Sequence, residues 1–119
     1  MDIESLRTFC LSLPGATEAI RWEHHLNFYV GGKMFCISTL DAEGRISFKV
    51  PDDRFDELAA RPCMIPSPYL ARMKWVFVER YEDLSDAEWR AFLAESYRLV
   101  REKLPKKIKT ALPPYADTL

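Results

Sequence analysis

The segment LNFYVGGKMFCISTLDAEGRISFKV, residues 26–50, contains three runs with β-strand patterning, separated by two turn signals. In RISFKV (45–50), apolar and polar side chains alternate at every position. Gly31 and Gly32 form a strong two-residue hairpin signal, and DAEG (41–44) turns the chain again. The segment therefore predicts an antiparallel β-meander.

The turns also predict which residues face each other across the strands. If Val30 faces Lys33, then Phe28 faces Phe35 and Leu26 faces Ile37. After the second turn, Ile37 faces Phe48. One face then collects a core: Leu26, Phe28, Phe35, Ile37, Ile46, Phe48 and Val50. The opposite, mixed face collects Asn27, Tyr29, Met34, Cys36, Ser38, Arg45, Ser47 and Lys49. Such a face is either the solvated back of a sheet or a partly covered groove that holds a partner.

Helical spacing of apolar residues predicts three helices around this sheet. Asp2 caps a first helix that ends at Pro14, and a short helix follows Pro51. Ser85 and Glu88 form a capping box that starts the longest helix. WVFVE (75–79) reads as an interior strand and RPCMIPSP (61–68) as a proline-punctuated loop.

The predicted fold class is α+β, an antiparallel β-meander sheet packed with an N-terminal helix, a short middle helix and a long C-terminal helix. We expect one domain over residues 1–107 and a C-terminal tail over residues 108–119.

The composition limits the classes of protein to which this chain can belong. An apolar content of 48% in 119 residues is ample for one core, and it argues against disorder. Seventeen Lys and Arg against eighteen Asp and Glu give a net charge of −1, whereas a dedicated nucleic-acid-binding domain is usually basic. The three cysteines are scattered along the sequence, which predicts reduced thiols and a cytoplasmic protein. No apolar run approaches the ~20 residues that a membrane span needs. We expect the protein to be a monomer.

The sequence lacks the motifs of an enzyme. It contains no G-x-S-x-G segment and no glycine-rich phosphate loop between a strand and a helix. His24 and His25 are adjacent, so on a strand they point to opposite faces and cannot hold one ion together. We therefore predict no catalytic residue, no metal site and no cofactor.

Positive charge is concentrated near the end of the longest predicted helix. Residues 98–109 carry six Lys or Arg side chains against one Glu, among them Arg98, Lys106 and Lys107. The helix dipole favours cations at this end, which explains the cluster without a partner. Alternatively, the cluster contacts phosphate or an acidic protein surface.

Several segments together resemble the MmcQ/YjbR family, in the right order over about residues 3–107. They are LPGATE (13–18), Trp22, GGKMF (31–35), ISFKV (46–50), PSPYLARMKWV (66–76) and the pair Ser96 and Tyr97. The resemblance implies a small bacterial α+β protein whose antiparallel sheet carries helices. Members are commonly labelled DNA-binding, because two hairpins look like a pair of wings.

The resemblance supplies no catalytic residue, and its polar members here are Lys33, Lys49 and Tyr69. Together with the charge pattern described above, it leads to the hypothesis of a non-enzymatic DNA-binding protein that uses the hairpin cations Lys33, Arg45 and Lys49 and the basic helix end. The alternative is a module that binds a protein or a small ligand. It would use the mixed face and the proline-rich loop around Tyr69.

Overall fold

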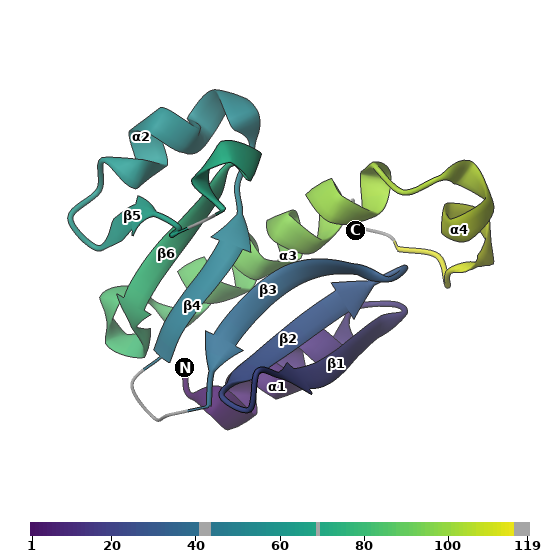
Figure 1. Cartoon of the computed structure of the whole chain (residues 1–119), viewed down its shortest axis with the longest axis horizontal. Coiled ribbons are helices and arrows are strands. Elements are labelled where there is room, and N and C mark those ends of the chain that lie inside the picture. Colours follow the sequence, from purple (N-terminus) through teal and green to yellow (C-terminus); the bar gives the residue numbers. More distant parts are fainter. Residues whose placement is uncertain (41–43, 69, 116–119) are drawn as a thin grey trace.

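The centre of the protein is an antiparallel sheet with the strand order β1-β2-β3-β4-β6-β5 (Figure 1). The computed structural model describes residues 1–40, 44–68 and 70–115. Its strands are β1 (Ala16–Arg21), β2 (His25–Val30), β3 (Lys33–Thr39), β4 (Gly44–Lys49), β5 (Met64–Pro66) and β6 (Trp75–Arg80). Its helices are α1 (Ile3–Ser12), α2 (Phe55–Ala59), α3 (Asp86–Glu102) and α4 (Lys106–Ala111), with short 3-10 turns η1 (Asp52–Arg54), η2 (Ala71–Met73) and η3 (Tyr81–Asp83). The predicted α+β class is confirmed, with its N-terminal, short middle and long C-terminal helices.

The core lies between the sheet and the helices α1 and α3, which run behind the strands in Figure 1. Phe48 of β4 is fully buried, and its ring centroid lies 6.1 Å from that of Trp89 and 5.4 Å from that of Phe92. Phe28 and Phe35 are equally buried and also contact each other. These aromatic side chains join the sheet to α3.

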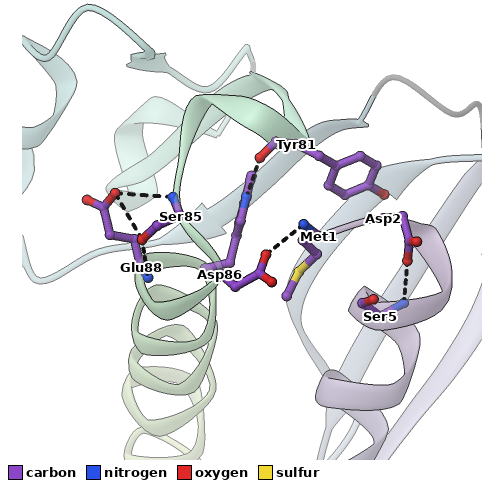
Figure 2. Close-up of polar contacts among 8 residues, drawn as sticks. Met1, Asp2, Ser5, Tyr81, Ser85, Asp86 and Glu88 are labelled. Carbon is purple, nitrogen blue, oxygen red and sulfur yellow. Dashed lines mark hydrogen bonds and ion pairs between the residues drawn. The ribbon is translucent and has the colours of Figure 1, made fainter.

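Figure 2 shows how the two main helices begin. The carboxylate of Asp2 accepts a first-turn N–H of α1 at 2.8 Å. In α3 the Glu88 N–H donates to Ser85 Oγ at 3.1 Å, and the Ser85 N–H donates to Glu88 Oε1 at 3.3 Å. The predicted capping box is therefore present. The amino group of Met1 lies 2.7 Å from Asp86 Oδ1 and links the starts of α1 and α3.

The predicted strand register is confirmed beside the hairpin, where Val30 pairs with Lys33, but it is wrong beyond Tyr29, because β3 contains one more residue than its partner accommodates. Tyr29 pairs with Met34 as predicted, but Phe28 pairs with Cys36, so the ladder shifts between Phe28 and Tyr29. Phe35 is the extra residue of a β-bulge. A hydrophobic pattern does not reveal such an insertion, since Phe35 is buried in either register.

The bulge changes which β3 side chains face the helices. Cys36 pairs with Phe48 and Ser38 with Ile46, and all four side chains are buried on the core side. Ile37, which was predicted to lie in the core opposite Phe48, pairs with Ser47 and is only half-buried. A one-residue shift moves each following side chain to the other face. The mixed face thus loses Cys36 and Ser38 and gains Ile37.

The segment 61–68 is also not entirely a loop. Met64–Pro66 form β5, which pairs with β6 at the edge of the sheet. Pro66 fits there because an edge strand does not need every backbone N–H for the ladder. With β5 outside it, β6 is an interior strand, as its nearly continuous apolar sequence predicts.

The C-terminal segment packs against the β2–β3 hairpin. A Cβ at Gly31, whose φ is +57°, would lie 2.5 Å from Leu104 Cδ1 and 2.9 Å from Ile108 Cγ2. Glycine is therefore favoured there both by the turn and by this close approach. The predicted end of the domain at residue 107 falls within α4, and Leu112 and Tyr115 pack against the core. The division into domain and tail stays a prediction.

Across the described ranges, none of the helices combines the length and the apolar character needed to cross a bilayer.

Candidate functional site

A concave site lies where β3 begins, β4 ends and the C-terminal end of α3 approaches them. It is a pocket of about 300 Å³. We call it the lysine pocket, and its lining residues are Lys33, Met34, Lys49, Leu70, Met73, Trp75, Val100, Lys103 and Leu104. Three cations and six apolar side chains thus share one cavity, and among the described residues that line it none is acidic.

The sheet topology brings the first two lysines to the same end of the molecule. Lys33 opens β3 directly after the glycine turn, and Lys49 closes β4. Because β3 and β4 are antiparallel, the start of one strand lies beside the end of the other. Trp75, the first residue of β6, pairs with Lys49 at the end of β4 and adds an apolar wall.

A serine of α3 fixes the backbone beside the pocket. The hydroxyl of Ser96, which is fully buried, donates to the Phe35 carbonyl at 2.6 Å and accepts the Lys49 N–H at 2.9 Å. The hydroxyl continues the β3–β4 ladder at the bulge, where direct pairing stops at Cys36 and Phe48. It thereby holds the end of β4 in register.

The side chain of Lys49 is held against the pocket wall. It is only 12% exposed, and its Nζ donates to the Met73 carbonyl at 2.6 Å. Its nearest carboxylate, Asp52 Oδ1, lies 3.9 Å away on a side chain that is 67% exposed, so this ion pair is weak. Burial lowers the pKa of Lys49, and the positive charges of Lys103 and Lys74 lower it further against the opposing effect of Asp52.

The proline-rich loop that forms the outer wall is pinned to the sheet. Ser47 Oγ and Ser67 Oγ lie 2.8 Å apart, and both residues are buried. The Ser67 N–H donates to the Trp75 carbonyl at 3.0 Å, and the Val50 N–H donates to the Lys74 carbonyl at 2.9 Å. These bonds position the segment that carries Leu70 and Met73, whereas Met73 itself remains 60% exposed at the pocket mouth.

Of the hairpin cations predicted from the sequence, the structure brings Lys33 and Lys49 together and leaves Arg45 apart. Arg45 lies near the start of β4, next to Gly44, which pairs with Arg80. Arg45 and Lys49 are four steps apart along the strand, or about 13 Å at ~3.3 Å per residue. Tyr69 lies outside the described residues.

None of the three cations predicted at the basic helix end lines the lysine pocket. Arg98 makes ion pairs with Glu95 at 3.5 Å and with Glu102 at 3.0 Å, so its charge is compensated locally. Lys106 and Lys107 are exposed on α4. Neither of them lines the lysine pocket.

Sequence reasoning did not select Lys103 as a site residue, although its signal was visible. Lys103 falls on the same helical stripe as the apolar residues Val100 and Leu104, and all three line the pocket. A lysine on an apolar stripe is expected to lie at the edge of a buried face. The sequence alone does not show that this edge borders a pocket, because the opposite wall comes from β3 and β4.

Comparison with known proteins agrees with this architecture. A model of the YjbR family matches residues 11–99, which is most of the chain. The chain belongs to the YjbR family. No curated protein matches it.

Two solved structures have the same fold as this YjbR-family chain. The Deinococcus radiodurans protein DR2400, described by the domain DUF419, is 27% identical to it, with a TM-score of 0.83 over 98% of this chain and 92% of that one. A Pseudomonas syringae protein is 15% identical, with a TM-score of 0.70 over 83% of this chain and 98% of that one. At 15% identity the second likeness shows the fold alone.

Metal ligation has no candidate site in residues 1–40, 44–68 and 70–115, where no group of three or more His, Cys, Asp or Glu side chains could hold an ion. The cysteines Cys10, Cys36 and Cys63 are free thiols. Burial and the neighbouring thiol of Cys10 raise the pKa of Cys36 well above its ordinary value, which makes Cys36 a poor nucleophile.

Proposed function

We propose that this YjbR-family chain is a binding module without catalytic activity, and that the lysine pocket binds a small anionic ligand with an apolar body. One observation carries the proposal: three lysines and six apolar side chains line a single pocket of about 300 Å³. Small-molecule sites are typically concave and mostly apolar, with a few polar groups that orient the ligand.

The chemistry of the lining defines the class of ligand. Lys33 and Lys103 are exposed at the rim, so they can approach a carboxylate or phosphate without losing their own hydration entirely. The apolar walls match a ring or a short hydrocarbon chain. The volume is at the lower end of the range of about 300–1,000 Å³ for ligand sites, which favours a compact ligand.

Methionine methyl NMR tests this proposal directly, because the chain has four methionines and only two of them line the pocket. On titration with 2-naphthoate we expect the methyl signals of Met34 and Met73 to shift. The signals of Met64, which is fully buried in the core, and of Met1 should stay in place. The uncharged analogue 2-naphthalenemethanol should bind more weakly.

Substitutions of the exposed lysines test how much their charge contributes to ligand affinity. Lys33→Gln and Lys103→Gln should each weaken 2-naphthoate binding about fivefold, since a partly exposed charge pair contributes about 1 kcal/mol. The matched control Lys107→Gln, on α4 outside the pocket, should leave the affinity unchanged. Absence of any shift at Met34 and Met73 at millimolar 2-naphthoate would contradict the proposal.

DNA binding is the second candidate, and the position of α4 favours it. Because α4 packs against the β2–β3 hairpin, four exposed lysines lie at one end of the molecule: Lys33, Lys103, Lys106 and Lys107. Lysines clustered on one side can bind phosphates of the backbone despite a net charge of −1. In this candidate the lysines contact DNA without reading its sequence.

Binding of a labelled duplex at several salt concentrations tests the DNA candidate. We expect a Kd of about 10⁻⁴–10⁻⁶ M at physiological salt that weakens steeply as salt rises. Lys106→Gln and Lys107→Gln should each reduce the salt slope by about one unit.

The control Arg98→Gln should have little effect, because Arg98 is paired with Glu95 and Glu102. Lys49→Ala should also change little, because the ammonium is held by the Met73 carbonyl. Failure to bind even at low salt would exclude this candidate.

A further inference from the structure

Lys49 differs from an ordinary surface lysine in how firmly it is held. Its backbone is fixed on both sides, by the Ser96 hydroxyl toward β3 and by pairing with Trp75 of β6. Its side chain is 12% exposed, and its Nζ donates to the Met73 carbonyl. The amine is therefore held at the wall of a mostly apolar cavity.

The charges around this amine favour its neutral form. Lys103 lines the same pocket, and Lys74 directly follows Met73, which also lines it. The opposing carboxylate of Asp52 is 3.9 Å away and largely solvated. Burial together with the nearby cations lowers the pKa of Lys49. A lysine that is desolvated and close to another cation is a better nucleophile than a solvated one.

We propose that Lys49 captures carbonyl compounds that carry an anionic group, as a reversible Schiff base, while Lys33 and Lys103 bind the anion. This inference rests on the proposed function of the lysine pocket and adds a covalent step to it. The ligands are aldehydes or oxo acids with a carboxylate or phosphate and a compact apolar body. The step is capture and release, without turnover.

The reaction balances without any further reagent. The Lys49 ammonium first gives one proton to solvent, and the neutral Nζ attacks the carbonyl carbon. A C–N bond forms, the carbonyl π pair moves to oxygen, and proton transfer from nitrogen to oxygen gives a carbinolamine. A proton from solvent then protonates the hydroxyl, the C–O bond breaks as water leaves, and the nitrogen lone pair forms the C=N bond of the protonated imine, so the proton given up in the first step is recovered. The Met73 carbonyl, which accepts the Lys49 ammonium at 2.6 Å, can accept the N–H of the protonated imine. The apolar walls limit the access of water that would hydrolyse the imine.

Trapping with pyridoxal 5′-phosphate and borohydride tests the proposal on the full chain. Hydride reduction converts each imine into a stable secondary amine, and peptide mass spectrometry then assigns the adducts to individual lysines. At substoichiometric probe we expect Lys49 to carry most of the adduct. We expect less at Lys74, which is not among the residues that line the pocket. Pyridoxal, which lacks the phosphate, should be trapped more slowly.

Matched variants separate the reactive amine from the anion-binding ones. Lys49→Arg keeps the charge but removes the nucleophile, so it should abolish the main adduct, whereas Lys74→Arg should not. Lys33→Gln and Lys103→Gln should slow trapping at Lys49. If Lys49→Arg unfolds, the adduct map of the unmodified chain still decides, since adducts spread evenly over the exposed lysines would overturn the proposal.

The naphthoate titration distinguishes this inference from the proposed function. If 2-naphthoate shifts Met34 and Met73 while Lys49 is not the main adduct, the covalent step is wrong and the binding site stands. If 2-naphthoate does not bind, the proposed function is wrong, and the anion-guided capture by Lys49 is wrong with it.

Discussion

Removing the hydroxyl of Ser96 is the sharpest perturbation of the link between the fold and the pocket. Ser96 Oγ donates to the Phe35 carbonyl and accepts the Lys49 N–H, and the residue is fully buried. In Ser96→Ala both backbone groups lose their partner at a site where water has little access. The substitution adds no atom and suits a helix, so the lost hydrogen bonds dominate the result.

The magnitude follows from these two groups. A buried backbone group without a partner is destabilising by about 1–3 kcal/mol. Ala gains about 0.5 kcal/mol in helix propensity over Ser, and partial relaxation of β3 toward β4 reduces the sum further. We therefore expect Ser96→Ala to lower the free energy of unfolding by about 2–4 kcal/mol.

Urea denaturation measures this change, and amide hydrogen exchange locates it. The Lys49 amide should exchange faster in Ser96→Ala than in wild type, because its acceptor is gone. The control is Ser12→Ala on α1, where the exposed hydroxyl donates only to the Phe9 carbonyl. It should stay within about 0.5 kcal/mol of wild type. An equally small effect of Ser96→Ala would refute the conclusion that its hydroxyl joins the two strands.

Four further outcomes are expected. Phe48→Ala should lower the free energy of unfolding by about 3–5 kcal/mol in urea, the range for a fully buried ring; an unchanged midpoint would contradict its place in the core. Gly31→Ala should be more destabilising than Gly32→Ala in thermal melts. Both residues have positive φ, but a Cβ at Gly31 would meet α3 and α4 side chains whereas one at Gly32 would meet nothing within 4 Å. Paired hydrogen bonds from Arg7 lower the pKa of Glu18, so the stabilisation is present above the unfolded-state pKa and is lost as the pH falls through the folded-state pKa. Glu18→Gln should accordingly lower stability by about 0.5–1 kcal/mol at neutral pH and have no effect at acid pH. EDTA should leave the melting temperature unchanged, and a drop of several degrees would reveal a metal site that the sequence does not predict.

Local signals in the sequence were sufficient for the elements and the fold class. Gly31 and Gly32 allow positive φ, so they specify the hairpin wherever the rest of the chain lies. The capping box of Ser85 and Glu88 depends on backbone groups within one helical turn. Each of these interactions joins residues only a few positions apart, which explains why the pattern alone predicted them.

The tertiary structure alone decided the register of β3 and the composition of the pocket. The bulge at Phe35 depends on how α3 packs, because the Ser96 hydroxyl takes the place of a direct bond between β3 and β4. Lys33, Lys49 and Lys103 are far apart in the sequence and meet only where strand ends and a helix end converge. No local pattern encodes such a meeting, since the free energy that fixes it comes from burial between distant segments.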